Sequence, residues 1–413
     1  MSEVIRVRMY QAGFGDCFLL LLPTADGLRT MLVDCGSLGG GKPAMKAVVP
    51  RLLEDVRALT GTAEGAPTHI DVIVATHRHK DHIGEFDRPE WAQVTAGEVW
   101  MPWTERPDDP IALRLRLAQE RMASALAAAL PDDADPGLAD LAANALSNQE
   151  ARARLLRIGG AASSKLRWLA AESPGTNPFT TPVLPGVELH VLGPLRDEAT
   201  FRDMDPPDTQ NFARRVGFVA PAAAAANGVD AGPGPFSSRW RLAKGSGSCT
   251  LNPREVGLLR QAIPDARFEL LALNDSLINS TSIALMLKIG GTHLLLPGDA
   301  QWSTWDAALA DPARRALLEK TSFYKVGHHG SENATPIEFV EGVLKDRKDC
   351  VSMASWVTRA NWDRIPEEHL VGGLKGVGPF ADHESIAQGP TFRSDSAADG
   401  STYYIEATIP VVD

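Results

Sequence analysis

The sequence predicts a mixed α/β fold in which two β sheets lie face to face and helices cover their outer sides. Apolar, strand-like runs come first as antiparallel hairpins and then alternate with helical segments. The same order recurs after residue 280. We find no internal repeat at solenoid spacing. The 413 residues allow one large domain or two, and we expect a single domain over residues 1–413.

The first half of the chain begins with three predicted strands. Val4 to Tyr10 alternates apolar and polar residues, Cys17 to Leu22 is continuously apolar, and Thr30 to Val33 ends at an Asp-Cys-Gly turn. Pro43 opens a helix to about Leu59, with apolar residues on one face. The run Ile70 to Ala75 is a further buried strand, and Glu98 to Met101 is a short one.

Two segments differ in character from the rest. Residues from about 110 to 172 are rich in Ala, Leu and Arg and predict two or three helices, in an insert over about 105–175. Its arginines could form a basic face over a site or lie on solvated helix faces, and we favour the second interpretation. They are Arg114, Arg116, Arg121, Arg152, Arg154 and Arg157. The stretch of about 194–253 is rich in Pro and Gly and predicts an irregular insert.

Order resumes with a predicted helix near Arg254 to Ile263. The second half then repeats the strand and helix pattern. We expect strands at Thr281–Ile289, Thr292–Leu296, Ser322–Val326, Val351–Trp356 and Tyr403–Val412, and helices at Ser303–Leu318 and Glu367–Leu374.

Charge and cysteine content limit the possible functions. The formal net charge of −11 works against tight, non-specific binding to nucleic acid, although it does not exclude phosphodiester chemistry at a metal site. Cys17, Cys35, Cys249 and Cys350 form no C-x-x-C pair, so we expect reduced, buried thiols in a cytoplasmic protein. No apolar run predicts a signal peptide or a membrane insertion.

The chemistry is concentrated in His77-Arg-His-Lys-Asp-His82, which follows a buried strand. Imidazole and carboxylate side chains together suit zinc, or iron or manganese. A solvated, charged loop is the alternative. His77 and His79 are two residues apart in an extended segment and can point the same way to hold one metal. Asp81 and His82 follow a bend and can hold a second.

Two further strand ends carry matching residues. Asp299 follows the strand 292–296, and His328 and His329 follow the strand 322–326. Strand ends on one edge of a sheet converge, so these residues can meet the first cluster. Asp299 can bridge two cations because a carboxylate has two oxygens, and one histidine of the later pair completes the second site.

The motifs resemble those of the metallo-β-lactamase superfamily: His77-x-His79-x-Asp81-His82, Gly298-Asp299 and a later His-Gly-Ser. More narrowly, Asn279-x-x-Ser282 and Lys325 to Ser331 are similar to the hydrolase domain of ComEC-type competence proteins. The resemblance covers roughly residues 4–102, 183–192 and 279–375 and includes no membrane part.

The resemblance implies a four-layer αββα sandwich with two divalent metals, zinc first and manganese or iron as alternatives. It implies that the metals are held by the residues that match the family motifs, namely His77, His79, Asp81, His82, Asp299 and His329. It implies a nucleophilic hydroxide between the metals, which makes Asp81 and Asp299 the catalytic carboxylates. Asp34 would orient a ligand histidine, and Asp16 would do likewise or serve a turn.

Other residues of these motifs have open roles. His328 would orient a ligand or face the substrate, while Lys325 and Ser331 would touch a phosphate; a solvated strand residue is the alternative for Lys325. The third histidine that typical members supply to the first metal is missing, and Asn279 or water would fill its place. His190 and His293 are weaker candidates for that ligand. His369 and His383 lie after the last motif; His369 could reach the site from above, but we favour a position on a helix surface.

These features favour a metal-dependent phosphodiesterase or nuclease. A hydrolase of a thioester, lactone, lactam or other carboxylic ester is the first alternative, because hydroxide attacks a carbonyl as readily. A non-catalytic, metal-binding regulatory protein is the second. The sequence leaves the substrate and the oligomeric state open, because the regions expected to cover the site carry no motif.

Overall fold

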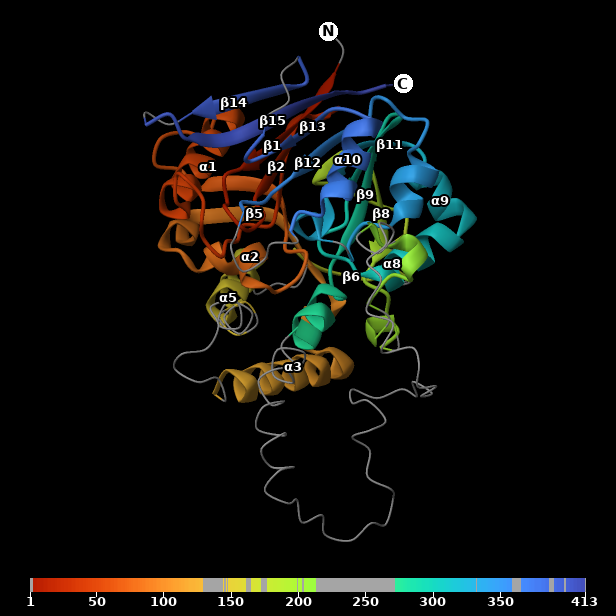
Figure 1. The fold of residues 1–413 in the computed structure, drawn as a ribbon. Coiled ribbons are helices and arrows are strands. Elements are labelled where there is room, and N and C mark those ends of the chain that lie inside the picture. The colour runs from red at the N-terminus through yellow and green to blue at the C-terminus, as the bar shows by residue number, and fades with distance from the viewer. Residues whose placement is uncertain are drawn as a thin grey trace, which may run out of the picture.

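The computed structural model describes residues 3–128, 144, 146, 148–160, 165–171, 177–198, 200–202, 204–212, 272–331, 333–358, 365–385, 390–396 and 399–412. Over these residues the chain folds into two mixed β sheets with helices around them (Figure 1). This confirms the predicted mixed α/β class. No helix among them is both long enough and apolar enough to cross a membrane.

The first sheet joins the two ends of the chain. Over the described residues it has eight strands in the order β14-β15-β1-β2-β3-β4-β5-β6. Their bounds are β1 (Val4–Tyr10), β2 (Phe18–Thr24), β3 (Gly27–Val33), β4 (Thr68–Val74), β5 (Val94–Pro102), β6 (Leu166–Leu169), β14 (Phe392–Ser396) and β15 (Thr402–Pro410). β1 pairs antiparallel with β15, with Val4 opposite Pro410, whereas β3 to β6 run parallel.

The second sheet has seven strands within the described part of the chain, in the order β13-β12-β11-β10-β9-β8-β7. They are β7 (Phe179–Thr181), β8 (Leu184–Gly193), β9 (Ala284–Ile289), β10 (Thr292–Leu296), β11 (Thr321–Lys325), β12 (Val351–Ala354) and β13 (Phe380–Asp382). β10 to β13 run parallel, and β7 to β10 are antiparallel.

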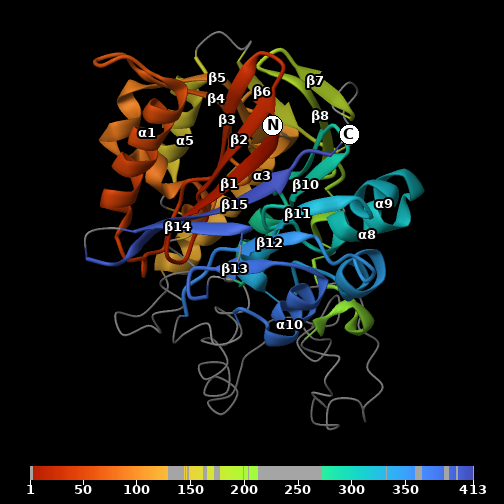
Figure 2. The ribbon, with the colours of Figure 1, turned by 90° about the horizontal axis from the view of Figure 1, so that it is seen from above.

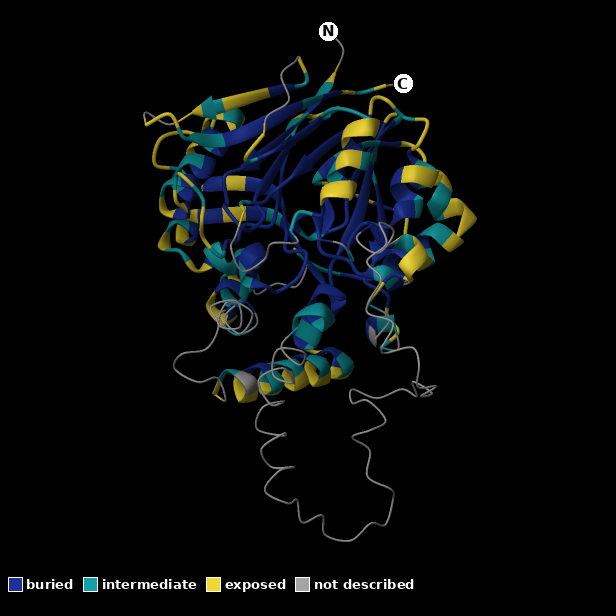
Figure 3. Ribbon diagram, in the orientation of Figure 1, coloured by how far each residue is buried: buried dark blue, intermediate teal, exposed yellow. Residues whose placement is uncertain are grey.

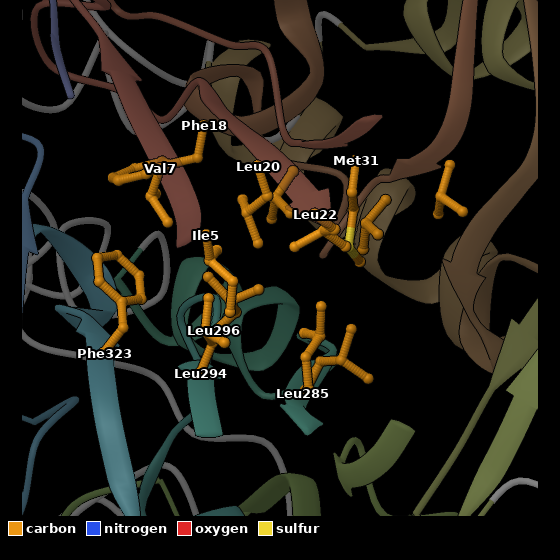
Figure 4. Packing of buried hydrophobic residues seen from close by; sticks show 14 of the residues in the cluster. Ile5, Val7, Phe18, Leu20, Leu22, Met31, Leu285, Leu294, Leu296 and Phe323 are labelled. Atoms are coloured by element: carbon orange, nitrogen blue, oxygen red, sulfur yellow. The ribbon is translucent and has the colours of Figure 1, made fainter. Parts of the chain in front are cut away.

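The facing sides of the two sheets share one hydrophobic core. Leu20 and Leu22 of β2 lie in the same cluster as Leu285 and Leu294 of the second sheet (Figure 4). Leu21, the residue between them, points to the opposite face of β2 and joins a different cluster. This alternation is the two-residue period of a strand, so a continuous apolar run gives a strand buried on both faces.

Helices cover the outer side of each sheet. α1 (Met45–Thr60) and α5 (Gln149–Ile158) pack on the first sheet, and α8 (Trp302–Ala310), α9 (Pro312–Leu318) and α10 (Glu368–Val377) pack on the second (Figure 2). Exposed residues gather on the outward faces of these helices, while the strands between them are buried (Figure 3). α3 (Pro110–Ala128) lies apart, below the sheets in Figure 1.

Several predicted elements differ from the structure. Residues 166–169 form β6 within the region expected to be helical, where Leu166 to Leu169 pair with β5. The single helix expected at 303–318 is two helices, because Pro312 starts α9 and Asp311 caps it. A helix at 272–279 was not predicted. The helix expected near Arg254, most of the 194–253 insert and Cys249 lie outside the described residues.

Candidate metal centre

The predicted site residues come together where the parallel strands of both sheets end. Asp34 follows β3 and His77 follows β4 in the first sheet, while Asp299 follows β10 and His328 follows β11 in the second. Parallel strands end on the same side of a sheet. The two sheets therefore bring residues more than 200 positions apart to one edge, with His77, His79, His82 and Asp299 all at most 1% exposed.

One half of the cluster surrounds Asp299. Its Oδ2 lies 3.0 Å from His82 Nε2 and 3.9 Å from His77 Nε2. His79 Nδ1 in turn lies 3.0 Å from His77 Nε2. The other oxygen, Oδ1, is turned away and accepts a hydrogen bond from the backbone N–H of His328 at 3.2 Å. Asp299 thus presents only Oδ2 to the histidines, whereas the sequence had suggested that each of its two oxygens would face a different cation.

The other half of the cluster surrounds Asp81. Its Oδ2 lies 3.1 Å from His329 Nε2 and 4.0 Å from His82 Nε2. Three groups of possible metal ligands result among the described residues: His77 with His82 and Asp299, Asp81 with His82 and His329, and Asp16 with Asp34 and His82. His82 belongs to all three groups. His79 belongs to none of them, but its Nδ1 contacts His77 of the first group.

The outward-facing nitrogen of each of these histidines has a partner. His82 Nδ1 donates to Asp34 Oδ2 at 2.8 Å, and His329 Nδ1 donates to the carbonyl of Ser355 at 2.7 Å. His77 Nδ1 lies 3.1 Å from Thr76 Oγ1. That hydroxyl donates its own hydrogen to Asp34 at 2.7 Å and can therefore accept from His77. Holding one ring nitrogen in this way directs the other inward as a ligand.

His79 differs: its Nε2 lies 3.3 Å from Asp275 Oδ1, yet it has no hydrogen-bond partner among the described residues. The inward nitrogens of His77 and His79 face each other, whereas those of His82 and His329 face the carboxylates of Asp299 and Asp81. His77 Nε2 and His79 Nδ1, 3.0 Å apart, cannot both accept without repelling each other. Asp81 Oδ1 is buried and has no hydrogen-bond partner among the described residues. A cation would satisfy all these atoms, so the donor set fits a metal ion.

Protonation follows the same arrangement. Burial lowers the pKa of His77 well below its ordinary value, and the nearby His82 adds to the effect. Burial also lowers the pKa of His79, although Asp275 and Asp81 oppose it. Burial alone would raise the pKa of Asp299, but the imidazoles of His82 and His328 outweigh it and hold the pKa well below the usual range. Neutral imidazole and ionised carboxylate are the forms that bind metal.

His82 and His329 behave differently from His77 and His79. Burial alone would lower the pKa of His82, yet the carboxylates around it, led by Asp299 and Asp81, raise it well above the ordinary value. The pKa of His329 is raised too, because its hydrogen bond to Asp81 outweighs burial. The carboxylates thus create a strongly negative pocket that attracts positive charge at these two nitrogens.

Unusual backbone conformations place several of these side chains. Asp34, His328 and His329 have φ of 59°, 43° and 52°, a region that residues with a Cβ rarely adopt. The turn after β11 thereby directs both histidines toward the edge. At Gly36 an added Cβ would lie 2.3 Å from the backbone nitrogen of His82, so only glycine permits this approach of the two loops.

Lys325 is buried behind the cluster rather than solvated. It is 2% exposed, its Nζ forms an ion pair with Asp16, and it lies 3.8 Å from Asp299 Oδ1. Asp16 Oδ2 also lies 3.5 Å from His82 Nδ1. The alternative of a solvated strand residue is therefore wrong. Asp16 takes part in the charge network instead of serving only a turn.

The sequence did not point to a polar chain that spans the first half of the cluster. Asp275, in the helix at 272–279, contacts His79 and accepts a hydrogen bond from Asn279 Nδ2 at 3.1 Å. Asn279 Nδ2 also lies 3.4 Å from His328 Nε2. Asn144 Nδ2 lies 3.3 Å from Asp275 Oδ1, and its own Oδ1 accepts from the Lys80 N–H at 2.8 Å. The insert and the 272–279 helix thus both contact the segment His77–His82.

The remaining histidines lie away from the cluster. His190 Nε2 forms a hydrogen bond with Glu188 at 2.7 Å, and His293 Nδ1 donates to the carbonyl of Gly291 at 3.0 Å. Neither histidine therefore supplies the missing third ligand. His369 pairs with Glu367 on an exposed helix start. His383 Nε2 lies 3.1 Å from Ser355 Oγ, behind the carbonyl that holds His329.

Ser331 belongs to the turn after β11 and contacts a neighbour of His328. Ser331 Oγ donates to Asn333 Oδ1 at 2.6 Å, and the same oxygen lies 3.3 Å from His328 Nδ1. Ser331 therefore contacts a partner of His328 within the protein. Asn279 Oδ1 is buried and has no hydrogen-bond partner within the described residues. This oxygen is therefore available as the ligand that was expected in place of the third histidine.

Compared with protein-family models and with curated proteins, the chain matches none of them. What it does is therefore inferred from the residues and geometry of this centre.

Proposed function

We propose that this protein is a metal-dependent hydrolase that cleaves phosphodiesters, with a four-layer αββα fold of the metallo-β-lactamase type and two divalent metals. Zinc is the first choice of metal, and manganese or iron are alternatives. The observation that carries the proposal is the set of inward-facing acceptors in a buried cluster of four histidines with Asp81 and Asp299. A cation would satisfy the facing nitrogens of His77 and His79 together with the unpartnered Asp81 Oδ1.

The side chains divide the work. His77, His79 and Asp299 would hold one metal, and Asp81, His82 and His329 the other. Two bound cations supply an activated water as nucleophile and positive charge for the pentavalent phosphorus. Asp34, Ser355 and Asp275 keep the ligand imidazoles oriented. Lys325 offsets the charge of Asp16 and Asp299 from behind.

The choice of a phosphodiester rests on residues of the second half. Asn279 and His328 lie beside the first half of the cluster. Asn279 Oδ1 is buried without a hydrogen-bond partner among the described residues, and the imidazole of His328 is partly exposed. Their motifs are similar to those of the ComEC-type hydrolase domain. An amide and an imidazole there can bind the non-bridging oxygens and the leaving group of a phosphodiester.

The test is hydrolysis of bis-p-nitrophenyl phosphate and of nucleic acid by protein loaded with manganese or zinc. We expect cleavage that chelation abolishes and that is lost in His79→Ala and Asp299→Ala. The substitution Asp306→Asn, at an exposed position of α8, is the matched control and should retain activity. Failure to cleave either substrate with any metal would contradict the proposal.

A carboxylic ester hydrolase is the second candidate, because the net charge of −11 disfavours polyanionic substrates. A panel of thioesters, lactones and aryl esters separates it from the first: turnover of the panel without turnover of phosphodiesters would favour it. A binding protein without catalysis would hold metal and turn over neither class.

A further inference from the structure

We propose that a cavity beside the segment His77–His82 binds a phosphate group of the substrate other than the scissile phosphodiester. The proposal rests on the proposed function. It makes the substrate a nucleotide chain with at least two phosphates rather than an isolated phosphodiester.

The cavity lies between two helices of the insert and has a volume of about 390 Å³, within the range of ligand pockets. One wall is a single face of α3, which presents Glu120, Arg121 and Ser124 at helical spacing. The other wall is the start of α5, which contributes Gln149 and Arg152.

Arg78 connects this cavity to the metal centre. It lies between His77 and His79 in the chain, and its guanidinium extends to α3, where Nη2 donates to Gln119 Oε1 at 2.8 Å. Its carbonyl accepts a hydrogen bond from Asn148 Nδ2 at 2.5 Å. Arg78 thus joins the wall of the cavity to the chain segment that carries His77 and His79.

The cavity and its surroundings carry excess positive charge. Arg78, Arg121 and Arg152 line it, and Arg116 is buried behind it. Burial, with the added effect of Arg152 and Arg78, lowers the pKa of Arg116. Glu120 lies 3.4 Å from Arg78 and Glu105 lies 2.7 Å from Arg152. Among the lining residues three guanidinium groups thus accompany one carboxylate, that of Glu120, in a protein whose overall charge is negative.

Arg121 has the most freedom to bind a ligand. It is exposed, and no ion pair or hydrogen bond involves it within the described residues. By contrast Arg114 pairs with Glu198 and Arg157 lies 3.9 Å from Glu150. Arg154 Nε has no hydrogen-bond partner among the described residues either, but its side chain is less exposed than that of Arg121. A guanidinium binds phosphate with two parallel hydrogen bonds.

The experiment compares Arg121→Gln with Arg114→Gln, which alters the same helix outside the cavity. Binding of a labelled single-stranded oligonucleotide of roughly 12 nucleotides is measured by fluorescence anisotropy in EDTA, so that no cleavage occurs. A dinucleotide with a 5′-phosphate is measured in the same way. Hydrolysis of bis-p-nitrophenyl phosphate, which has one phosphate, is followed in parallel with manganese.

We expect Arg121→Gln to weaken binding of both nucleic-acid probes about tenfold, as loss of a charge-assisted hydrogen bond does. The slope of log K against log salt should fall by about 1. Turnover of bis-p-nitrophenyl phosphate should stay as in Arg114→Gln. A loss confined to the longer probe would still support the cavity, but as a site for a more distant phosphate.

Two results would overturn the inference: equal binding by the two variants, or an equal loss on bis-p-nitrophenyl phosphate and on nucleic acid. If the wild-type protein hydrolyses no phosphodiester at all, the proposed function fails. The binding measurement in EDTA still decides whether the cavity holds phosphate.

Discussion

His79 Nε2 faces Asp275 Oδ1 at a distance of 3.3 Å, inside the protein and at the metal-binding segment. The other nitrogen of the same ring lies 3.0 Å from His77 Nε2. A carboxylate on one ring nitrogen fixes the tautomer and leaves the other free for a metal. Asp275 therefore adds negative charge beside the half of the cluster for which the sequence offered no third histidine.

Replacing Asp275 by Asn should weaken that half selectively. The amide keeps the size of the side chain but loses the charge that favours Nε2–H of His79. We expect the affinity for one of two metal equivalents to fall by about 10- to 100-fold, with the other unchanged. Calorimetric titration with manganese or zinc measures this. Asp306→Asn should bind as the wild type does, and an unaltered D275N isotherm would show that Asp275 orients nothing.

Metal removal should destabilise the fold. The buried acceptors of His77, His79, Asp81 and Asp299 face one another, so a cation that binds the folded state alone raises stability by mass action. We expect the Tm to fall on chelation and to recover when manganese or zinc is added back. In Asp299→Ala the metal-dependent part of the change should be much smaller. A Tm that does not change on chelation would mean that the cluster holds no cation.

The sequence could predict most of the candidate metal ligands because four of them are close together in the chain. His77, His79, Asp81 and His82 lie within six residues after an apolar strand, and strand periodicity places Asp299 at the end of another strand. Asp275 and Asn144 escaped prediction because they come from segments without motifs. Their contacts cross long stretches of chain, and no local pattern records which distant residue an exposed-looking Asp or Asn will meet.

The burial of Lys325 was equally hidden. Lysine in a strand is exposed far more often than buried, and its partner Asp16 lies at the other end of the chain. Local signals also misjudged some elements. Leu166 to Leu169 sits in an Ala- and Arg-rich region that favours helix, yet pairing with β5 makes it a strand.

Lys325→Met should be strongly destabilising. It would leave Asp16 and Asp299 buried without their cation, and breaking a buried ion pair from one side costs about 3–5 kcal/mol. Urea unfolding of metal-free protein measures the difference, and Lys320→Met, at an exposed position, should change little. If Lys325→Met kept wild-type stability but raised only KM, the lysine would bind substrate instead.

Glu98 in β5 should make stability depend on acid pH. Burial would raise its pKa, but hydrogen bonds from Arg167, Trp100 and Thr181 outweigh burial and lower it. A lowered folded pKa contributes stability above the unfolded value of about 4.3, and that contribution disappears as pH falls through the folded pKa.

Glu98→Gln should therefore cost about 2–3 kcal/mol at neutral pH and progressively less below pH of about 4. Urea unfolding across that range measures it, with Glu64→Gln at an exposed position as the control. A cost for Glu98→Gln that stayed constant down to acid pH would show that the carboxylate charge contributes nothing.

The number of metal ions bound per chain tests the central claim most directly. Equilibrium dialysis against manganese or zinc, followed by elemental analysis, should give two equivalents for the wild-type protein, with a reduced value for His79→Ala and for His329→Ala. Less than one equivalent in well-folded wild-type protein would contradict a two-metal centre at the edge of the sheets.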